Sequence, residues 1–186
     1  MRKIIYQNIL VFFLYFFLFE IQNQTFFIAQ QKLFDTPQYI IGAASLLFIP
    51  HGVRVLSYIF FGPKIFFGLY LAHIVTGLNF TSELYQLIIP ALFSSICALV
   101  AIKIYTGDFI LKDLNKLNVK FILYVSIISA LFNSLTVNTY KLLTGSEFGE
   151  IYSSQLIQYL IGDLVGTLIL FYIFIFVRKI IRQSFY

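Results

Sequence analysis

Short polar stretches divide this chain into apolar runs, and the length of those runs constrains its fold more than any other feature. A helix needs about 20 mostly apolar residues to cross the hydrocarbon core of a bilayer. Runs of this kind recur throughout the 186 residues, of which 60% are hydrophobic and only 11% are charged. A water-soluble fold could not remove so much apolar surface from water. We therefore expect an all-α, polytopic integral membrane helical bundle whose main partner is the lipid bilayer.

The apolar runs predict about six transmembrane helices in a single domain over residues 1–186. A tight turn at "FGPK" separates the second helix from the third. The first run follows a charged start, "MRK", as in a signal peptide, but no small-x-small cleavage site follows it, and we expect an uncleaved first helix. The expected helices cover residues 4–20, 39–61, 63–78, 84–105, 119–143 and 155–177.

The placement of Lys and Arg predicts how these helices are oriented, because cytoplasmic loops carry an excess of both residues. With six crossings, all of the 13 Lys and Arg residues except Lys32 and Lys141 fall on one side of the membrane. We therefore expect both termini in the cytoplasm of a bacterium, with the chain as a multi-pass protein of the cytoplasmic (inner) membrane. The net charge of +5 is spread over helix ends, which indicates topology and not nucleic-acid binding.

Well inside the predicted spans, away from their ends, lie the ionisable residues His51, Arg54, His73 and Asp163. A charge at the bilayer centre costs about 2.5–3.5 kcal/mol on insertion scales, so such residues need a reason to be there. One interpretation is a polar or ligand-binding pocket facing the bundle interior, with Asp163 as partner of His51 or Arg54. The other is structural: Arg54 extends to the cytoplasmic headgroups, the histidines bond backbone carbonyls, and Asp163 pairs with a neighbour during folding.

Proline and glycine mark where the predicted helices bend or approach one another. A proline inside a membrane helix removes a backbone hydrogen bond, so a kink is expected at Pro50, eased by the glycine two residues later. The "GDLVG" segment places two glycines on one face of the last helix, which permits close contact. The residues expected to serve in kinks and packing are Pro50, Gly52, Gly62, Pro63, Gly68, Gly162 and Gly166.

Catalytic and cofactor motifs are missing from the sequence. It contains no HExxH, no P-loop and no glycine-rich dinucleotide turn, and its His and Asp residues lack the short spacing of a metal site. The one cysteine, Cys97, lies in an apolar segment and is expected to be buried. We therefore expect no enzyme activity, no cofactor and no metal.

Three segments, in order, resemble the membrane-associated sensor domain family of type one. They are "FIPHGVRVLSYIFFG", "PKIFFGLYLAHIVTG" and "QYLIGDLVGTLILFY", which together extend from Phe48 to Tyr172. The chain departs from the family pattern in having no tryptophan before the Gly-Asp pair. The resemblance implies a sensory or ligand-binding membrane module for signal transduction, with a ligand of unknown identity. Since only "RKIIRQSFY" follows the last helix, we expect signalling or assembly through a separate membrane or cytoplasmic partner protein.

Two other classes of protein stay open. Six helices and this length are also typical of the vitamin-type substrate-binding subunits of energy-coupling-factor transporters. The first helix of those subunits usually presents small residues to the transport motor, whereas "NILVFFLYFFLFE" is bulky throughout. A structural or assembly subunit of a larger membrane complex is the third class, and no residue pattern indicates it specifically.

Overall fold

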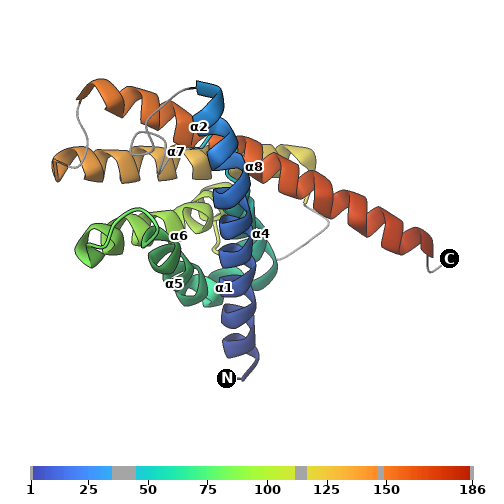
Figure 1. Cartoon of the computed structure of the whole chain (residues 1–186). Coiled ribbons are helices and arrows are strands. Elements are labelled where there is room, and N and C mark those ends of the chain that lie inside the picture. Colours follow the sequence, from blue (N-terminus) through green and yellow to red (C-terminus); the bar gives the residue numbers. More distant parts are fainter. Residues whose placement is uncertain (1, 35–44, 112–116, 146–148, 185–186) are drawn as a thin grey trace.

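A computed structural model describes residues 2–34, 45–111, 117–145 and 149–184. Every regular element in these ranges is a helix (Figure 1), which confirms the all-α prediction. The elements are α1 (Arg2–Gln22), the π-helical turn η1 (Asn23–Phe27), α2 (Ile28–Phe34), α4 (Ile49–Phe61), the 3₁₀ turn η2 (Gly62–Ile65), α5 (Phe66–Gly77), α6 (Leu84–Thr106), α7 (Val119–Leu143) and α8 (Gly149–Ser184).

Within the described ranges, five helical segments are long and apolar enough to cross a membrane. They are Arg2–Gln30, Ile49–Gly77, Leu84–Thr106, Val119–Leu143 and Gln155–Val177. This count differs from the six helices that we predicted. The predicted helices over 39–61 and 63–78 correspond to the single segment Ile49–Gly77, by length and composition. α4 has 13 residues and α5 has 12, or about 20 and 18 Å of helix, short of the roughly 30 Å hydrocarbon core.

α4 and α5 nevertheless run in opposite directions, because both can be followed along α1. The amide of Ile49 donates to Gln22 Oε1 near the far end of α1. At the near end, Asn8 donates to the carbonyl of Lys64 in η2 and accepts from the amide of Gly68 in α5. Further up α1, Tyr15 contacts His73 of α5. α4 therefore runs antiparallel to α1, and α5 runs back in the direction of α1 on the other side of α1 (Figure 1).

The reversal depends on the glycines and the proline of this region. Gly62 ends α4 with a φ of 68°, a backbone conformation that residues other than glycine rarely adopt, and Pro63 follows at the start of η2. A Cβ at Gly68 would collide with the backbone of Asn8, so glycine there allows α1 and α5 to touch. The tight turn expected at "FGPK" is thus part of the fold.

The expected helix over 39–61 is wrong at residues 45–48 and correct from 49 to 61. Residues 39–44 lie outside the described residues, 45–48 are not helical, and α4 begins at Ile49. Pro50 consequently occupies the first turn of a helix, where its missing amide proton costs nothing, and the kink predicted there is absent from α4 as described.

The last helix explains why the chain stays extended before α4. The amide of Phe48 donates to the carbonyl of Gly162 at 2.9 Å. A Cβ at Gly162 would collide with the carbonyl oxygen of Ser45, and one at Gly166 with that of Phe48. The two glycines of "GDLVG" therefore do permit close contact, but mainly with the non-helical backbone that leads into α4.

The remaining helices continue the alternation of direction. The side chain of Leu87, near the start of α6, lies against Gly77, and Ile110, beyond its end, lies against Gly62. α7 returns, with its first turn beside Tyr105 of α6. We call the two ends of the bundle the Lys64 end and the Asn79 end. Lys103, near the end of α6, and Lys120, in the first turn of α7, therefore lie toward the Lys64 end.

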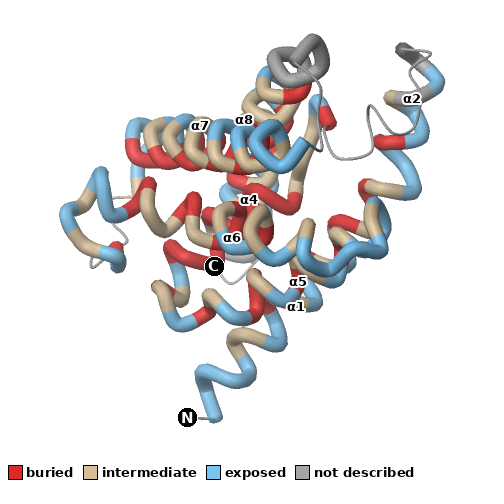
Figure 2. Tube along the Cα trace, turned by 90° about the vertical axis from the view of Figure 1, so that its left-hand side faces the viewer, coloured by how far each residue is buried: buried red, intermediate tan, exposed pale blue. Residues whose placement is uncertain are grey.

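The outer surface is apolar, as expected of a lipid-facing bundle. Buried residues follow the faces that the helices turn toward one another, while much of α1 is exposed (Figure 2). Exposed large residues of α1 include Ile5, Leu10, Phe13 and Phe17. Soluble proteins rarely expose so continuous an apolar face, so this surface supports a membrane protein.

Candidate functional site

A buried polar cluster lies where α4, α7 and α8 meet. Asp163 of α8 has its Oδ2 atom 3.0 Å from His51 Nδ1 and its Oδ1 atom 3.7 Å from a terminal nitrogen of Arg54. Asn133 of α7 donates to Asp163 Oδ2 at 2.5 Å. All four side chains are at most 1% exposed. From the sequence we proposed Asp163 as a partner of His51 or Arg54, and in the structure its carboxylate lies beside both side chains.

Helix spacing brings the two α4 residues to one face. His51 and Arg54 are three residues apart and so lie on the same side of α4. α4 packs closely on α8 in this region: a Cβ added at Gly52 would lie only 2.9 Å from the Leu170 side chain. Arg54 therefore points into the bundle, and its extension to the cytoplasmic headgroups, one of the two alternatives above, is wrong.

The Arg54 guanidinium has partners besides Asp163. One terminal nitrogen donates to the carbonyl of Ser94 at 2.9 Å and lies 3.5 Å from Cys97 Sγ. Its central carbon lies 5.6 Å from the Phe48 ring centroid and 6.0 Å from that of Tyr15. The Nε atom has no hydrogen-bond partner among the described residues. The distance to Asp163 exceeds hydrogen-bond length, so this ion pair leaves donor capacity unused.

His73 does not join the cluster around Asp163. It lies on α5, where its Nδ1 atom is 3.3 Å from the hydroxyl of Tyr15 and the two ring centroids are 4.6 Å apart. Its Nε2 atom is buried and has no partner within the described ranges. The four ionisable residues singled out by the sequence therefore form a group of three and a separate histidine, with Tyr15 in contact with both Arg54 and His73.

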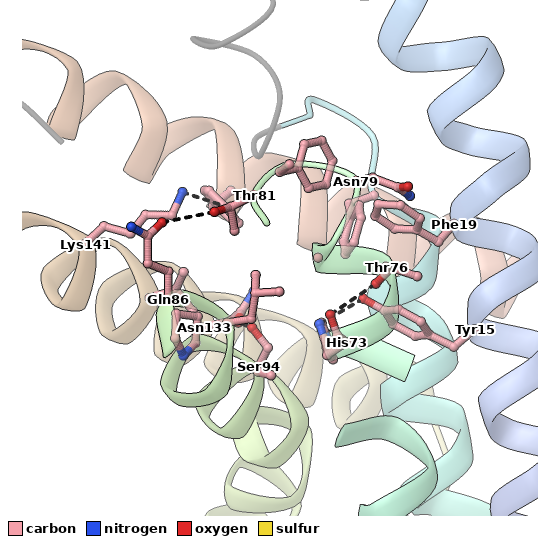
Figure 3. A pocket seen from close by; sticks show the side chains of 18 of the residues that line it. Tyr15, Phe19, His73, Thr76, Asn79, Thr81, Gln86, Ser94, Asn133 and Lys141 are labelled. Atoms are coloured by element: carbon pink, nitrogen blue, oxygen red, sulfur yellow. Dashed lines mark hydrogen bonds between the residues drawn. The ribbon is translucent and has the colours of Figure 1, made fainter. Parts of the chain in front are cut away.

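A cavity of about 710 Å³ connects these two places. Its inner end, at mid-bundle, is formed by Arg54, His73, Tyr15, Ser94 and Asn133. Figure 3 shows Tyr15 and His73 on one side, with Gln86 and Lys141 approaching from the other. The inner end is thus polar, although it lies among spanning helices.

The walls and the rim of the cavity differ in character. Phe19, Phe27, Phe48 and Phe80 line one wall, and the Phe19 ring packs edge-on against each of the other three, with centroids 5.9–6.2 Å apart. The rim lies at the Asn79 end and is polar: it consists of Asn79, Thr81, Gln86, Lys141 and Tyr159. Polar side chains such as these are more favourable in contact with water than in contact with lipid.

Asp163 is separated from this large cavity. It borders a second void of only about 10 Å³, together with Ser45, Phe48 and Tyr159. That volume is at the lower limit for a single water molecule. The cation, and not the carboxylate, of the buried pair therefore faces the space in which a larger molecule fits.

The sequence interpretation missed the polar residues of α6 and α7. Asn133 links two helices, since it bonds Asp163 and also accepts from Ser94 Oγ at 2.7 Å. Ser129 Oγ lies 2.8 Å from His51 Nε2. A signal was present: Ser126, Ser129 and Asn133 recur at three- and four-residue spacing, which places them on one face of an otherwise apolar helix.

The donor set limits what the site can hold. Within the described part of the chain, no group of three or more His, Cys, Asp or Glu side chains is placed to hold a metal ion. The arrangement is suited to noncovalent binding, because it combines an aromatic wall with a few convergent polar groups. No family model, curated protein or solved structure matches this chain.

Proposed function

We propose that this chain is an integral membrane protein that binds a small molecule in the 710 Å³ cavity and acts as a sensory module. The cavity supports the proposal, since ligand sites typically measure about 300–1,000 Å³ and combine apolar walls with a few polar groups. The unknown ligand enters past the polar rim at the Asn79 end and reaches Arg54 and His73. A separate partner protein receives the signal.

The proposal includes six membrane crossings, with both termini in the cytoplasm of a bacterium and the chain in its inner membrane. The alternating directions of α1, α4, α5, α6, α7 and α8 support an even number. α8 runs in the same direction as α4, since Gly166 lies against Phe48 and Phe174 against Phe60. Lys64, Lys103 and Lys120 at one end support its assignment to the cytoplasm. The cavity then opens to the opposite, outer side. Non-helical backbone at 45–48 is compatible with membrane depth because α8 covers it.

A substrate-binding subunit of an energy-coupling-factor-like transporter is the second candidate. The observation that favours it is the direction of the cavity, because a capture subunit needs an outward opening. The bulky exposed face of α1 argues for the sensor, since a motor protein docks more closely on small residues. The two functions share the binding step and differ in the partner.

Native mass spectrometry of the protein in mild detergent tests the binding step. Val137→Phe enlarges a buried residue of the cavity wall, whereas Leu135→Phe makes a similar change on an exposed face of the same helix. We expect a small molecule to be retained by the wild type and by Leu135→Phe, and to be lost from Val137→Phe. Equal retention by all three proteins, or none by any in the presence of native membrane extract, would contradict the proposal.

The same preparation separates the two partner classes. A co-purifying kinase or cyclase supports sensing. A co-purifying ATPase pair with a membrane coupling subunit supports transport and overturns the sensory assignment while leaving the binding step intact.

A further inference from the structure

The cavity has a preferred charge. Its described lining includes two cationic side chains, Arg54 and Lys141, and no Asp or Glu. Asp163 neutralises part of the Arg54 charge at 3.7 Å but borders only the small void of about 10 Å³. A molecule in the large cavity therefore meets the cation first, and a cationic molecule would have no carboxylate to pair with there.

The inner end also presents donors without acceptors. Arg54 is 1% exposed, and its Nε–H group has no partner among the described residues. When the Tyr15 hydroxyl donates to His73 Nδ1, the proton of the neutral ring lies on Nε2, which also lacks a described partner. An unpaired buried donor costs about 1–3 kcal/mol, so an acceptor that came within reach of either atom would offset that cost.

The start of α4 does not serve as the anion site in their place. The amide of Ile49 already donates to Gln22 Oε1, residue 50 is a proline, and the amide of His51 donates to the Phe48 carbonyl. The binding of an anion thus depends on the side chains of Arg54 and His73.

We propose that the ligand is an organic monocarboxylate with an aromatic or other apolar body. Its carboxylate lies at the inner end and accepts from Arg54 and His73, and its body packs on the wall formed by Phe19, Phe27, Phe48 and Phe80. A carboxylate suits Arg54 because a guanidinium donates two parallel hydrogen bonds to its oxygens. This inference rests on the proposed binding function and specifies its ligand class.

Thermal unfolding of the full chain in mild detergent tests the inference with three matched probe series. The series are phenylalkanoates of increasing chain length, the corresponding primary amides and the corresponding amines. We expect the carboxylates to raise the unfolding temperature at concentrations about tenfold lower than the amides, and the amines to have the least effect.

Variants connect that preference to the named side chains. Arg54→Lys keeps the charge but removes the planar pair of donors, and His73→Leu removes Nε2. Either change should reduce the preference for carboxylate over amide to about threefold or less. Tyr58→Phe, one turn further along α4 and outside the cavity lining, should leave it unchanged. If Arg54→Lys does not fold, His73→Leu alone decides.

The outcomes separate this inference from the proposed function. Amides or amines that bind as well as carboxylates, with binding abolished by Val137→Phe, would overturn the carboxylate assignment and leave the binding function standing. A retained molecule without an acidic group, identified by mass spectrometry, would do the same. If no probe of any series and no retained molecule depends on the cavity, both proposals fail.

Discussion

Arg54 and Asp163 offer the sharpest test of the buried cluster, because each is the other's counter-ion. Their charged atoms are 3.7 Å apart and both side chains are about 1% exposed. At an effective dielectric constant of 20, unit charges at that distance attract by about 4.5 kcal/mol. Removing one partner of a buried pair leaves an uncompensated charge and typically costs about 3–5 kcal/mol. Both estimates exceed the average of about 0.6 kcal/mol for a hydrogen bond between membrane helices.

We therefore expect Asp163→Asn and Arg54→Met each to lower the free energy of unfolding by about 3–5 kcal/mol. Asparagine retains an oxygen that accepts from Asn133, so the first change removes mainly charge. The double variant has no unpaired charge, and its loss should be smaller than either single loss. The measurement is a dodecyl sulfate titration in mixed micelles, followed by circular dichroism.

Glu83→Gln is the matched control, since it makes the same kind of change at an exposed position before α6, where we expect about 0.5 kcal/mol or less. Losses that add in the double variant to within about 0.5 kcal/mol would refute the coupling on which the argument depends.

Predictions about helix contacts follow from the same structure, at two glycines and one asparagine. Gly166→Ala should lower the free energy of unfolding by about 1–3 kcal/mol, because its Cβ would meet the backbone of Phe48. Gly77→Ala should cost less, since its Cβ meets the flexible Leu87 side chain, and an equal cost would contradict the close backbone approach. Asn8→Leu removes the hydrogen bonds to Lys64 and Gly68 and should lower the free energy of unfolding by about 1–2 kcal/mol in the same titration. A stability equal to that of the wild type would show that these bonds do not hold α1 against α5.

Hydropathy alone was sufficient to predict much of the helical fold. α7 spans Val119–Leu143, as expected, and α6 ends one residue beyond its expected bound at 105. These helices are long and mostly apolar, so local composition decides their limits. Neighbouring segments matter less for them.

The start of α4 could not be predicted in this way. Residues 39–61 form one apolar stretch, yet the structure begins the helix at Ile49. Distant groups stabilise the non-helical backbone at 45–48 and the start of α4. Gln22 accepts from the Ile49 amide, and the absence of side chains at Gly162 and Gly166 leaves space for the backbone of 45–48. Such contacts involve residues more than 25 positions away, which a local pattern does not reveal.

The candidate site could be predicted only in part, because which side chains meet also depends on contacts between distant segments. The cost of burying charge singled out His51, Arg54 and Asp163, and that physical argument does not depend on knowing which helices touch. His73 met the same criterion but lies against Tyr15 in a different place. Asn133 is uncharged and so was overlooked, although it bonds Asp163 directly.

The central claim is that a water-accessible cavity opens on the outer side of the membrane, and the reactivity of single cysteines tests it most directly. In a Cys97→Ala background, Ala91→Cys places a thiol in the cavity lining, and Leu92→Cys places one on the exposed, lipid-facing side of α6. A small membrane-impermeant thiol reagent added to spheroplasts should modify Ala91→Cys and leave Leu92→Cys and Lys64→Cys unmodified. Modification of Lys64→Cys from outside, with Ala91→Cys unreactive, would contradict both the orientation and the cavity.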